Sequence, residues 1–469
     1  MATALQRVAV VGAGAAGLCA ARHILSRPDR FAPPVLYELS TNVGGTWCYE
    51  ERVGTYDDGR PILSSMYRHL RTNLPKEVMM FPDFPFEELP RSFLPHQEVR
   101  RYLETYCDNY KISPHIRVSH SCPVLSITCQ HSHVCQFSTV VEDVKGVVMA
   151  TGGEEERTTW EVMSSDGLGC RRTEMFDSVF VCSGHYSDPY IPDVAGLEKF
   201  KGQVLHSHAY RSADAFSGLS VVVLGARASG LDISLELANV GAQVTLSHGR
   251  PPLTFPLPAE IRQSSLVASV EDDGRIRFQD GSLKEADVLL FCTGYKFSFP
   301  FLDAQQLALD IQDHLVAPLY RFMMPPAFPS LFFIGICKTI CPFPYFHCQV
   351  QFALSVLDGS VSLPSRAQME DEVRQWQQGK VDVGVPLRHL LVMDQDQWEY
   401  LNTIADEAGF PPLPPVVRSL YEEVWQQRQV HPQNYRQLKY RLVSDTQWQL
   451  VDDAGTSSYN GRDGGDSVI

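Results

Sequence analysis

Two stretches of this chain, about 200 residues apart, share the order of buried strand, glycine-rich turn and helix. In the first, RVAVVG (residues 7–12) reads as a strand, residues 16–25 as a helix and residues 35–39 as a second strand. The second repeats this order, with strands over residues 221–225 and 242–248 around the helix-forming ASGLDISLELANVG. Such βαβ units place the glycine turn at the carboxyl end of a buried strand, where dinucleotides bind. The pattern predicts an α/β protein with two nucleotide-binding lobes.

Length and charge agree with this organisation. The chain has 469 residues, of which 44% are hydrophobic, and single cores stop growing at about 250–300 residues. Two packed domains are therefore expected. The formal net charge of -15 argues against nucleic acid as the main partner, because an acidic chain repels phosphate backbones.

Later apolar strands suggest how the lobes are connected. Residues 177–185 and 286–295 each form an apolar run that ends in small residues, and LFFIGI (residues 331–336) reads as a strand returning to the first lobe. Residues 113–170 alternate in polarity and predict a small antiparallel insert. The fold class is thus α/β, with two Rossmann-like domains, the second inserted into the first. The predicted boundaries are 1–212 and 321–451 for the first domain, 213–320 for the inserted domain and 452–469 for a flexible, Gly/Ser/Asp-rich tail.

The first glycine turn is a complete G-x-G-x-x-G motif between a strand and a helix. Its glycines permit a tight turn, close approach of a pyrophosphate and close packing of the helix on the strand. Glu38, 21 residues after the last glycine, suits a carboxylate that accepts hydrogen bonds from ribose hydroxyls. The motif alone does not separate FAD from NAD. The predicted contacts are Gly12, Ala13, Gly14, Ala15, Ala16, Gly17 and Glu38, and the Gly44-Gly45-Thr46-Trp47 loop could admit a flat ring or be a simple turn.

The second glycine turn departs from the motif at its middle position, where Arg227 replaces glycine. A Cβ there crowds the phosphate approach, but the guanidinium could add a charge-assisted contact to that phosphate. No acidic residue follows the second strand of this lobe, and Arg250 stands nearby. An arginine accommodates the 2′-phosphate of NADP, so NADPH is predicted, with an ordinary solvated arginine as the alternative. The predicted contacts are Gly225, Arg227, Ser229, Gly230, Leu231, Asp232 and Arg250.

A longer motif lies between the two lobes. Residues 200–210, FKGQVLHSHAY, resemble the Phe-x-Gly-x-x-x-His-x-x-x-Tyr fingerprint of flavin-containing monooxygenases, and Tyr210 favours the N- and S-oxygenating branch over Baeyer–Villiger enzymes, whose motif ends in Trp. The Gly44–Trp47 loop, residues 70–77 (LRTNLPKE), residues 291–295 (FCTGY) and residues 341–344 (CPFP) are similar to further segments of this family. Cys292 replaces an alanine of the family linker. The closest similarity is to the soluble S-oxygenating type.

This resemblance implies FAD and NADPH as cofactors, and transfer of one oxygen atom from O2 to a soft nitrogen or sulfur centre through a C4a-hydroperoxyflavin. It places Asn73 at the position of the family's functional amide. An amide suits this role because it donates and accepts hydrogen bonds without titrating. An Asn that caps a nearby helix is the alternative. His206 and Tyr210 are expected to bridge the lobes. The cofactor contacts implied beyond the first turn are Gly45, Thr46, Trp47, Thr72, Asn73, Leu74, Val124 and Gln349.

Other functions remain open on the sequence alone. The rivals are an NADPH oxidase or Baeyer–Villiger-type flavoenzyme, and a non-catalytic dinucleotide-binding protein. No Cys/His spacing predicts a metal site, and the 12 cysteines are expected to be reduced in a cytoplasmic protein. No apolar run of about 18 residues predicts a membrane anchor. The expected partners are O2 and an amine or thioether substrate. The oligomeric state is open, a homodimer being one option, and Ser467-Val468-Ile469 resembles a C-terminal PDZ ligand.

Overall fold

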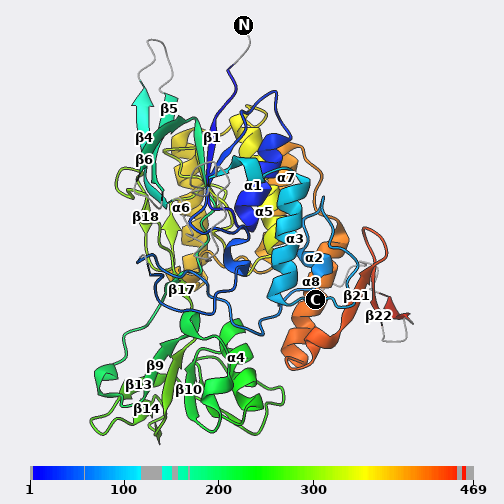
Figure 1. Cartoon of the computed structure of the whole chain (residues 1–469). Helices are drawn as coiled ribbons and strands as arrows, with labels where there is room; N and C mark the ends of the chain where they lie inside the picture. Colours follow the sequence, from blue (N-terminus) through cyan, green and yellow to red (C-terminus); the bar gives the residue numbers. More distant parts are fainter. Residues whose placement is uncertain are drawn as a thin grey trace, which may run out of the picture.

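The computed structural model describes residues 4–57, 59–117, 140–149, 157–166, 170–451 and 457–460. The chain forms a larger domain and a smaller one, which lies at the bottom of Figure 1 and is inserted into the larger. Strands from both sides of the insertion join the same sheet of the larger domain. The predicted architecture of one nucleotide-binding lobe inside the other is therefore confirmed.

The larger domain is built on a five-stranded parallel sheet in the order β20-β7-β1-β2-β3. Strand β1 reads VAVV and is entirely buried, because a parallel sheet covered on both faces requires apolar side chains throughout. Strand β20 pairs with β7, with Leu331 opposite Val179, so the return strand expected from LFFIGI is confirmed. The bounds are β1 Val8–Val11, β2 Val35–Tyr37, β3 Ile116–Arg117, β7 Ser178–Val181 and β20 Leu331–Phe333.

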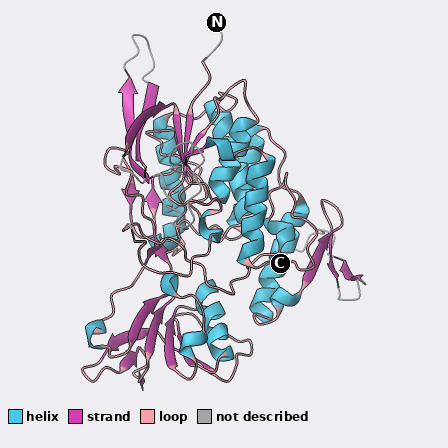
Figure 2. Cartoon of the chain, viewed as in Figure 1, coloured by secondary structure: helices cyan, strands magenta, loops and turns pink. Residues whose placement is uncertain are grey.

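Helices pack beside this sheet. Helix α1 contacts both α3 and α5, and α7 packs on α5 (Figure 2). The helices from the return segment therefore cover the helix that begins at the first glycine turn. The bounds are α1 Ala15–Leu25, α2 Lys76–Met79, α3 His96–Asn109, α5 Pro342–Leu357, α6 Arg366–Asp382, α7 Asp396–Ala408 and α8 Pro415–Val430.

A small antiparallel sheet, β4-β5-β6, is attached to the larger domain. Its strands are β4 Val140–Met149, β5 Arg157–Ser165 and β6 Arg171–Phe176. The indole of Trp160 is fully buried, and its Nε1 donates to Ser330 Oγ (2.9 Å) just before β20. An antiparallel insert was expected over residues 113–170, and the described part of it extends to residue 176.

The smaller domain has a second parallel sheet, in the order β12-β11-β10-β16-β9, with helix α4 packed on it. A three-stranded antiparallel sheet, β13-β14-β15, lies at its far end (Figure 1). The bounds are β9 Gln203–His206, β10 Ser220–Leu224, α4 Ala228–Asn239, β11 Gln243–Ser247, β12 Ile261–Ser264, β13 Val267–Val270, β14 Ile276–Phe278, β15 Leu283–Lys284 and β16 Val288–Phe291.

Both predicted boundaries of the inserted domain need correction. Strand β9 pairs with β16, so the second sheet begins before residue 213. Residues 297–320 pack into the core of the larger domain, where Phe297, Leu302 and Tyr320 are buried. Two short strands, β8 Asp188–Pro189 and β17 Tyr295–Lys296, pair where the chain crosses between the domains. The strands β18 Asp310–Ile311 and β19 Val316–Ala317 follow in the larger domain.

The last described residues form a small sheet. Strands β21 Lys439–Leu442, β22 Trp448–Val451 and β23 Ser457–Asn460 form an antiparallel sheet beside α8 (Figure 1). Strand β23 falls within the predicted tail of residues 452–469, so that prediction was too broad. In the described residues, no helix has the length and apolar character to cross a membrane, and the nine cysteines that the structure places there are unpaired.

Candidate active site

The first glycine turn forms a cradle whose glycines pack against backbone atoms and leave no room for a Cβ. Gly12 has a φ of +108°, and a Cβ on it would lie 2.5 Å from the carbonyl oxygen of Cys182 at the end of β7. A Cβ on Gly17 would lie only 1.9 Å from the carbonyl oxygen of Gly12. Helix α1 begins immediately after Gly14 without a side-chain cap, so its first N–H groups are free to bind a phosphate.

The Gly44-Gly45 loop closes over this cradle. Gly45 has a φ of +55°, and a Cβ on it would lie 2.9 Å from Gly14 Cα. The N–H of Gly44 donates to the carbonyl of Ala13 (3.0 Å), while Thr46 is exposed and Trp47 packs on the core. Two backbones without side chains therefore face each other where a flat cofactor is expected.

Glu38 lies at the rim of the same cradle and is buried. The N–H of Ala13 donates to its Oε2 and the N–H of Ser40 to its Oε1, both at 2.7 Å. Burial raises the pKa of the carboxyl, and these N–H bonds oppose the rise. Because each carboxylate oxygen can accept a second hydrogen bond, the carboxylate retains capacity for ribose hydroxyls.

The segment with the predicted functional amide, residues 72–74, is held by the core and by the turn that contains Tyr435 and Arg436. Thr72 is buried and its Oγ1 accepts from the N–H of Leu94 (3.0 Å), while Leu74 packs on the core. Asn73 Oδ1 accepts from Arg436 Nη2 (2.6 Å) and from the Tyr435 hydroxyl (3.2 Å). The next helix, α2, has Pro75 as its N-cap and no side-chain cap. The helix-capping alternative for Asn73 is therefore excluded.

The second glycine turn repeats the first. A Cβ on Gly225 would lie 2.6 Å from the carbonyl oxygen of Cys292, and a Cβ on Gly230 would lie 1.7 Å from that of Gly225. Helix α4 begins after Arg227, again without a side-chain cap. The Arg227 backbone, with φ of -84° and ψ of -167°, is extended, so arginine is accommodated here without strain. Ser229 lies in the first turn of α4, and Leu231 packs on the core of the smaller domain.

A group of positive charges surrounds this second turn. Partial loss of water and then the charges of Arg250 and Arg388 lower the pKa of Arg227. Burial and then Arg227 lower the pKa of Lys338 to about 8. Within the described residues, none of these four side chains forms an ion pair. Clustered cations without counter-ions destabilise one another, so the group is suited to bind an anion such as a phosphate.

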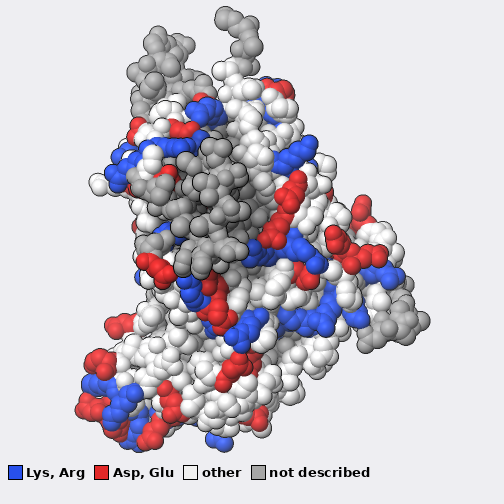
Figure 3. Space-filling view, viewed as in Figure 1, with Lys and Arg blue, Asp and Glu red and all other residues white. Residues whose placement is uncertain are grey.

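The group draws on both domains. Arg227 and Arg250 belong to the smaller domain, whereas Lys338 and Arg388 come from the return segment. Arg227 Nη2 lies 3.5 Å from His389 Nε2, and a hollow of about 400 Å³ opens beside Arg388. On the face of the molecule shown in Figure 3, basic and acidic side chains are interspersed.

The fingerprint segment holds the domains together, as expected. His206 Nδ1 accepts from the N–H of His208 (3.0 Å), which leaves Nε2 to donate to the carbonyl of Gly294 (3.0 Å) in the interdomain linker. Tyr210 is buried in the smaller domain, donates to Glu236 Oε2 (2.7 Å) and packs edge-on against Tyr67 of the larger domain.

Two of the predicted contacts have other partners in the structure, and a third is not described. Gln349 is fully buried, with Oε1 accepting from the N–H of Gly335 (2.8 Å) and Nε2 bonded to Tyr400 (3.0 Å), so its side chain anchors α5 and does not line the cradle. Asp232 faces Tyr67 and Arg436 across the domain interface. Val124 lies outside the described residues.

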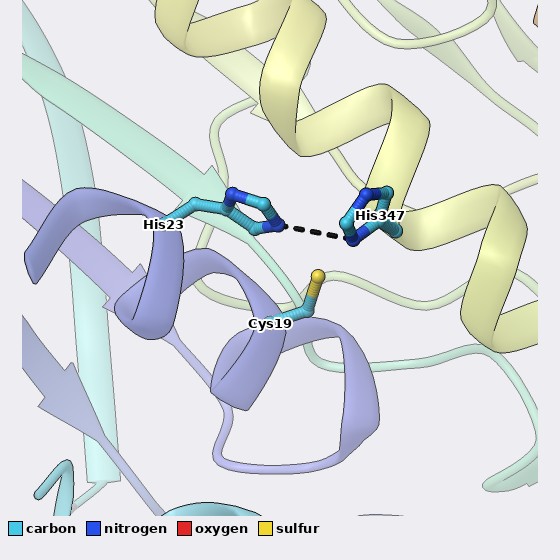
Figure 4. A group of neighbouring side chains, drawn as sticks. All are labelled: Cys19, His23 and His347. Carbon is cyan, nitrogen blue, oxygen red and sulfur yellow. Dashed lines mark hydrogen bonds between the residues drawn. The ribbon is translucent and has the colours of Figure 1, made fainter. Parts of the chain in front are cut away.

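A cluster that the spacing did not predict lies between α1 and α5, where Cys19, His23 and His347 converge (Figure 4). Arg22 Nη1 lies 3.1 Å from His23 Nδ1, and His23 Nε2 lies 3.1 Å from His347 Nδ1. Arginine can only donate, so His23 Nδ1 accepts and its Nε2 carries the proton that is donated to His347. A metal ion would need that nitrogen's lone pair, so the cluster is a hydrogen-bonded link between helices.

Sequence reasoning also missed residues that act from a distance along the chain. Arg436 reaches Asn73 over 363 positions, and Lys338 and Arg388 join Arg227 from the other domain. Arg211 follows Tyr210 directly and is buried among backbone carbonyls. Of these residues, Arg211 had a signal in the sequence, because it directly follows the last residue of the fingerprint.

Comparison with known proteins identifies the family. The profile of the flavin-binding monooxygenase-like family matches residues 5–252 and 258–460. This chain belongs to that family. The flavin-containing monooxygenase FMO GS-OX-like 2 of Arabidopsis thaliana is 37% identical over 429 residues, which cover 87% of this chain and 86% of that protein.

Solved structures agree with this assignment. The S-allyl-L-cysteine S-oxygenase of Allium sativum is similar with a TM-score of 0.80 and 32% identity, over 93% of this chain and 96% of that one. Tmm from Pelagibacter sp. has a TM-score of 0.78 and 27% identity, over 97% and 96%. The chain is therefore an NADPH-dependent flavin monooxygenase with FAD and NADP as cofactors, which transfers oxygen from O2 to nitrogen or sulfur in small molecules.

Proposed function

We propose that this flavin monooxygenase oxygenates the sulfur of small thioethers, with FAD in the first glycine cradle and NADPH in the second. The sulfur preference is supported by the likeness to a plant S-oxygenase over 93% of the chain. The placement of FAD is supported by the bare backbone between Gly14 and Gly45 and by the carboxylate of Glu38. The placement of NADPH is supported by the unpaired cations around Arg227.

When bound, FAD accepts reducing equivalents from NADPH and activates O2 for transfer to a lone pair on the substrate. The protein itself has to bind both cofactors, orient them and shield the reacting centre from water. The N–H groups at the starts of α1 and α4 bind the two pyrophosphates, with contacts from Ala13, Ala15 and Ala16 in one turn and Ser229 in the other. Asn73 offers its amide N–H to the reacting centre. The remaining contacts proposed for FAD come from Thr46, Trp47, Thr72 and Leu74.

The decisive measurement is the stoichiometry with a small thioether such as an S-alkylcysteine. A monooxygenase forms one sulfoxide for each NADPH consumed, whereas an NADPH oxidase releases one hydrogen peroxide instead. We expect the wild-type protein to form mainly sulfoxide. Asn73→Ala should raise the fraction of peroxide about tenfold, because a lost donor in a water-excluded site costs at least that factor. Unchanged sulfoxide and peroxide yields in Asn73→Ala would remove the catalytic role from Asn73.

A second prediction concerns the choice of cofactor. Replacing Arg250 with Gln should weaken NADPH binding about 10–100-fold, because a hydrogen bond to a charged group contributes about 1.5–3 kcal/mol. Binding of NADH should change little, since NADH lacks the 2′-phosphate. Titration of both cofactors into the wild-type and Arg250→Gln proteins measures this difference. Equal weakening of both cofactors would show that Arg250 does not contact the 2′-phosphate, and Arg262→Gln, on β12, is the matched control.

The expectations about a PDZ partner, the oligomeric state and the cellular location stay predictions. Ser467-Val468-Ile469, the segment that resembles a PDZ ligand, lies outside the described residues. A cytoplasmic location is expected from the sequence, and a homodimer is one option for the oligomeric state, which stays open.

A further inference from the structure

Arg436 lies where three distant segments of the chain meet. It belongs to the short turn of 3-10 helix over Tyr435–Gln437, after α8. Its Nε donates to the carbonyl of Thr72 (3.1 Å) and its Nη2 to Asn73 Oδ1 (2.6 Å). Both terminal nitrogens also contact the carboxylate of Asp232, with Nη2 3.2 Å from Oδ2. The guanidinium thus joins the proposed catalytic segment to helix α4 of the other domain.

These contacts determine which way the Asn73 amide points. An arginine has donors and no acceptor, and the Tyr435 hydroxyl donates to the same atom, so that atom must be the amide oxygen. The oxygen of Asn73 is therefore occupied by two donors. Its Nδ2 has no hydrogen-bond partner among the described residues, and this N–H group is what Asn73 offers to a ligand.

The opposite end of the contact lies on the helix that begins the NADPH cradle. Asp232 is five residues into α4, and its carboxylate also accepts from the hydroxyl of Tyr67. The side chains of Arg436 and Asp232 are only 16% and 17% exposed. An ion pair shielded to this degree has a fixed geometry, and loss of one partner leaves a costly unpaired charge.

An ion pair that only stabilised the domain interface would need no contact with Asn73. Here one nitrogen, Nη2, serves both the Asn73 amide and Asp232. We propose that Arg436 is a positioning residue, which holds the Asn73 amide with its N–H outward and ties that orientation to α4. The inference rests on the proposed role of Asn73.

The test uses flavin-loaded full-length protein and neutral replacements. Arg436→Gln alone leaves Asp232 unpaired and can fail to fold, so the main variant is the double replacement Arg436→Gln/Asp232→Asn, which removes both charges. We expect this variant to retain flavin and to release about tenfold more hydrogen peroxide per NADPH than the wild type. Addition of NADP+ should also change the visible spectrum of its bound, oxidised flavin differently from that of the wild type. This readout does not depend on turnover.

Asp232→Asn separates the two halves of the proposal. This variant keeps the bonds of Arg436 to Asn73 and removes its tie to α4, so the affinity for NADP+ should fall and the peroxide released per NADPH should rise less than in the double variant. Arg321→Gln is the matched control, because Arg321 pairs with Glu372 and Glu407, is 21% exposed and does not contact Asn73. It should lose stability without extra peroxide, and a rise in peroxide equal to that of the double variant would overturn the proposal.

A comparison in the Asn73→Ala background decides whether Arg436 acts through Asn73. If it does, adding Arg436→Gln/Asp232→Asn to Asn73→Ala produces no further peroxide, because the amide to be positioned is already gone. Multiplied effects would overturn the inference while leaving the proposed function intact. If Asn73→Ala alone changes nothing, the role of Asn73 fails first, and the two failures are thus distinguished.

Discussion

Replacing Gly17 with alanine is expected to give a protein that no longer binds flavin, whereas Gly230→Ala keeps its flavin and is no longer reduced by NADPH. The added Cβ would lie 1.9 Å from the carbonyl oxygen of Gly12 in the first case and 1.7 Å from that of Gly225 in the second. Both obstacles are backbone atoms, so the helix has to move away from its strand by more than about 1 Å. A shift of that size costs on the order of 100-fold in binding or rate.

The measurement is the flavin content of purified protein, from its visible absorbance, followed by the rate of anaerobic reduction by NADPH. Gly241→Ala is the matched control, because a Cβ on Gly241 meets nothing within 4 Å, although its φ of +79° makes that substitution mildly destabilising. Full flavin content in Gly17→Ala would show that the first cradle does not hold FAD. Normal reduction of Gly230→Ala by NADPH would remove NADPH from the second cradle.

Local sequence patterns were sufficient for the framework of both domains. The strands β1 and β10, the helices that follow them and the return strand β20 were predictable because each is a short apolar run next to a glycine turn. The two glycine motifs also located both cradles, because the absence of a Cβ can be read directly from the residue type.

Residues that depend on packing between distant segments were not predictable. Gln349 was expected to contact a cofactor, but the N–H of Gly335 and the hydroxyl of Tyr400 occupy its amide in the core. The predicted domain boundary at residue 213 lies after the true start of the second sheet. Strand β9 is part of the fingerprint segment, and its pairing with β16, more than 80 residues away, leaves no local pattern in the sequence. The cations that adjoin Arg227 come from the return segment, and a single sequence does not show which basic residues converge.

Removing the guanidinium of Arg211 is expected to destabilise the folded protein strongly. Arg211 is 8% exposed and donates to six backbone carbonyls, those of Glu50, Arg52, Ser64, Met66, His208 and Tyr210, at 2.6–3.3 Å. Burial lowers its pKa, yet the carbonyl dipoles take the place of a counter-ion. The side chain thus joins residues 50–66 of the larger domain to the end of the fingerprint segment.

Arg211→Met preserves much of the volume but leaves those carbonyls without their donor. We expect a loss of about 3–5 kcal/mol, the range found when one partner of a buried charged network is removed. Arg211→Lys should recover little of it, because a single ammonium group lacks the planar set of donors that reaches all six carbonyls. Urea unfolding monitored by tryptophan fluorescence measures the difference, with Arg101→Met as the control, since Arg101 is 59% exposed and pairs with Glu98 on the same helix. The control should cost less than about 1 kcal/mol. An equal cost for the two methionine variants would mean that the carbonyls around Arg211 find water instead, and that the interface does not depend on this side chain.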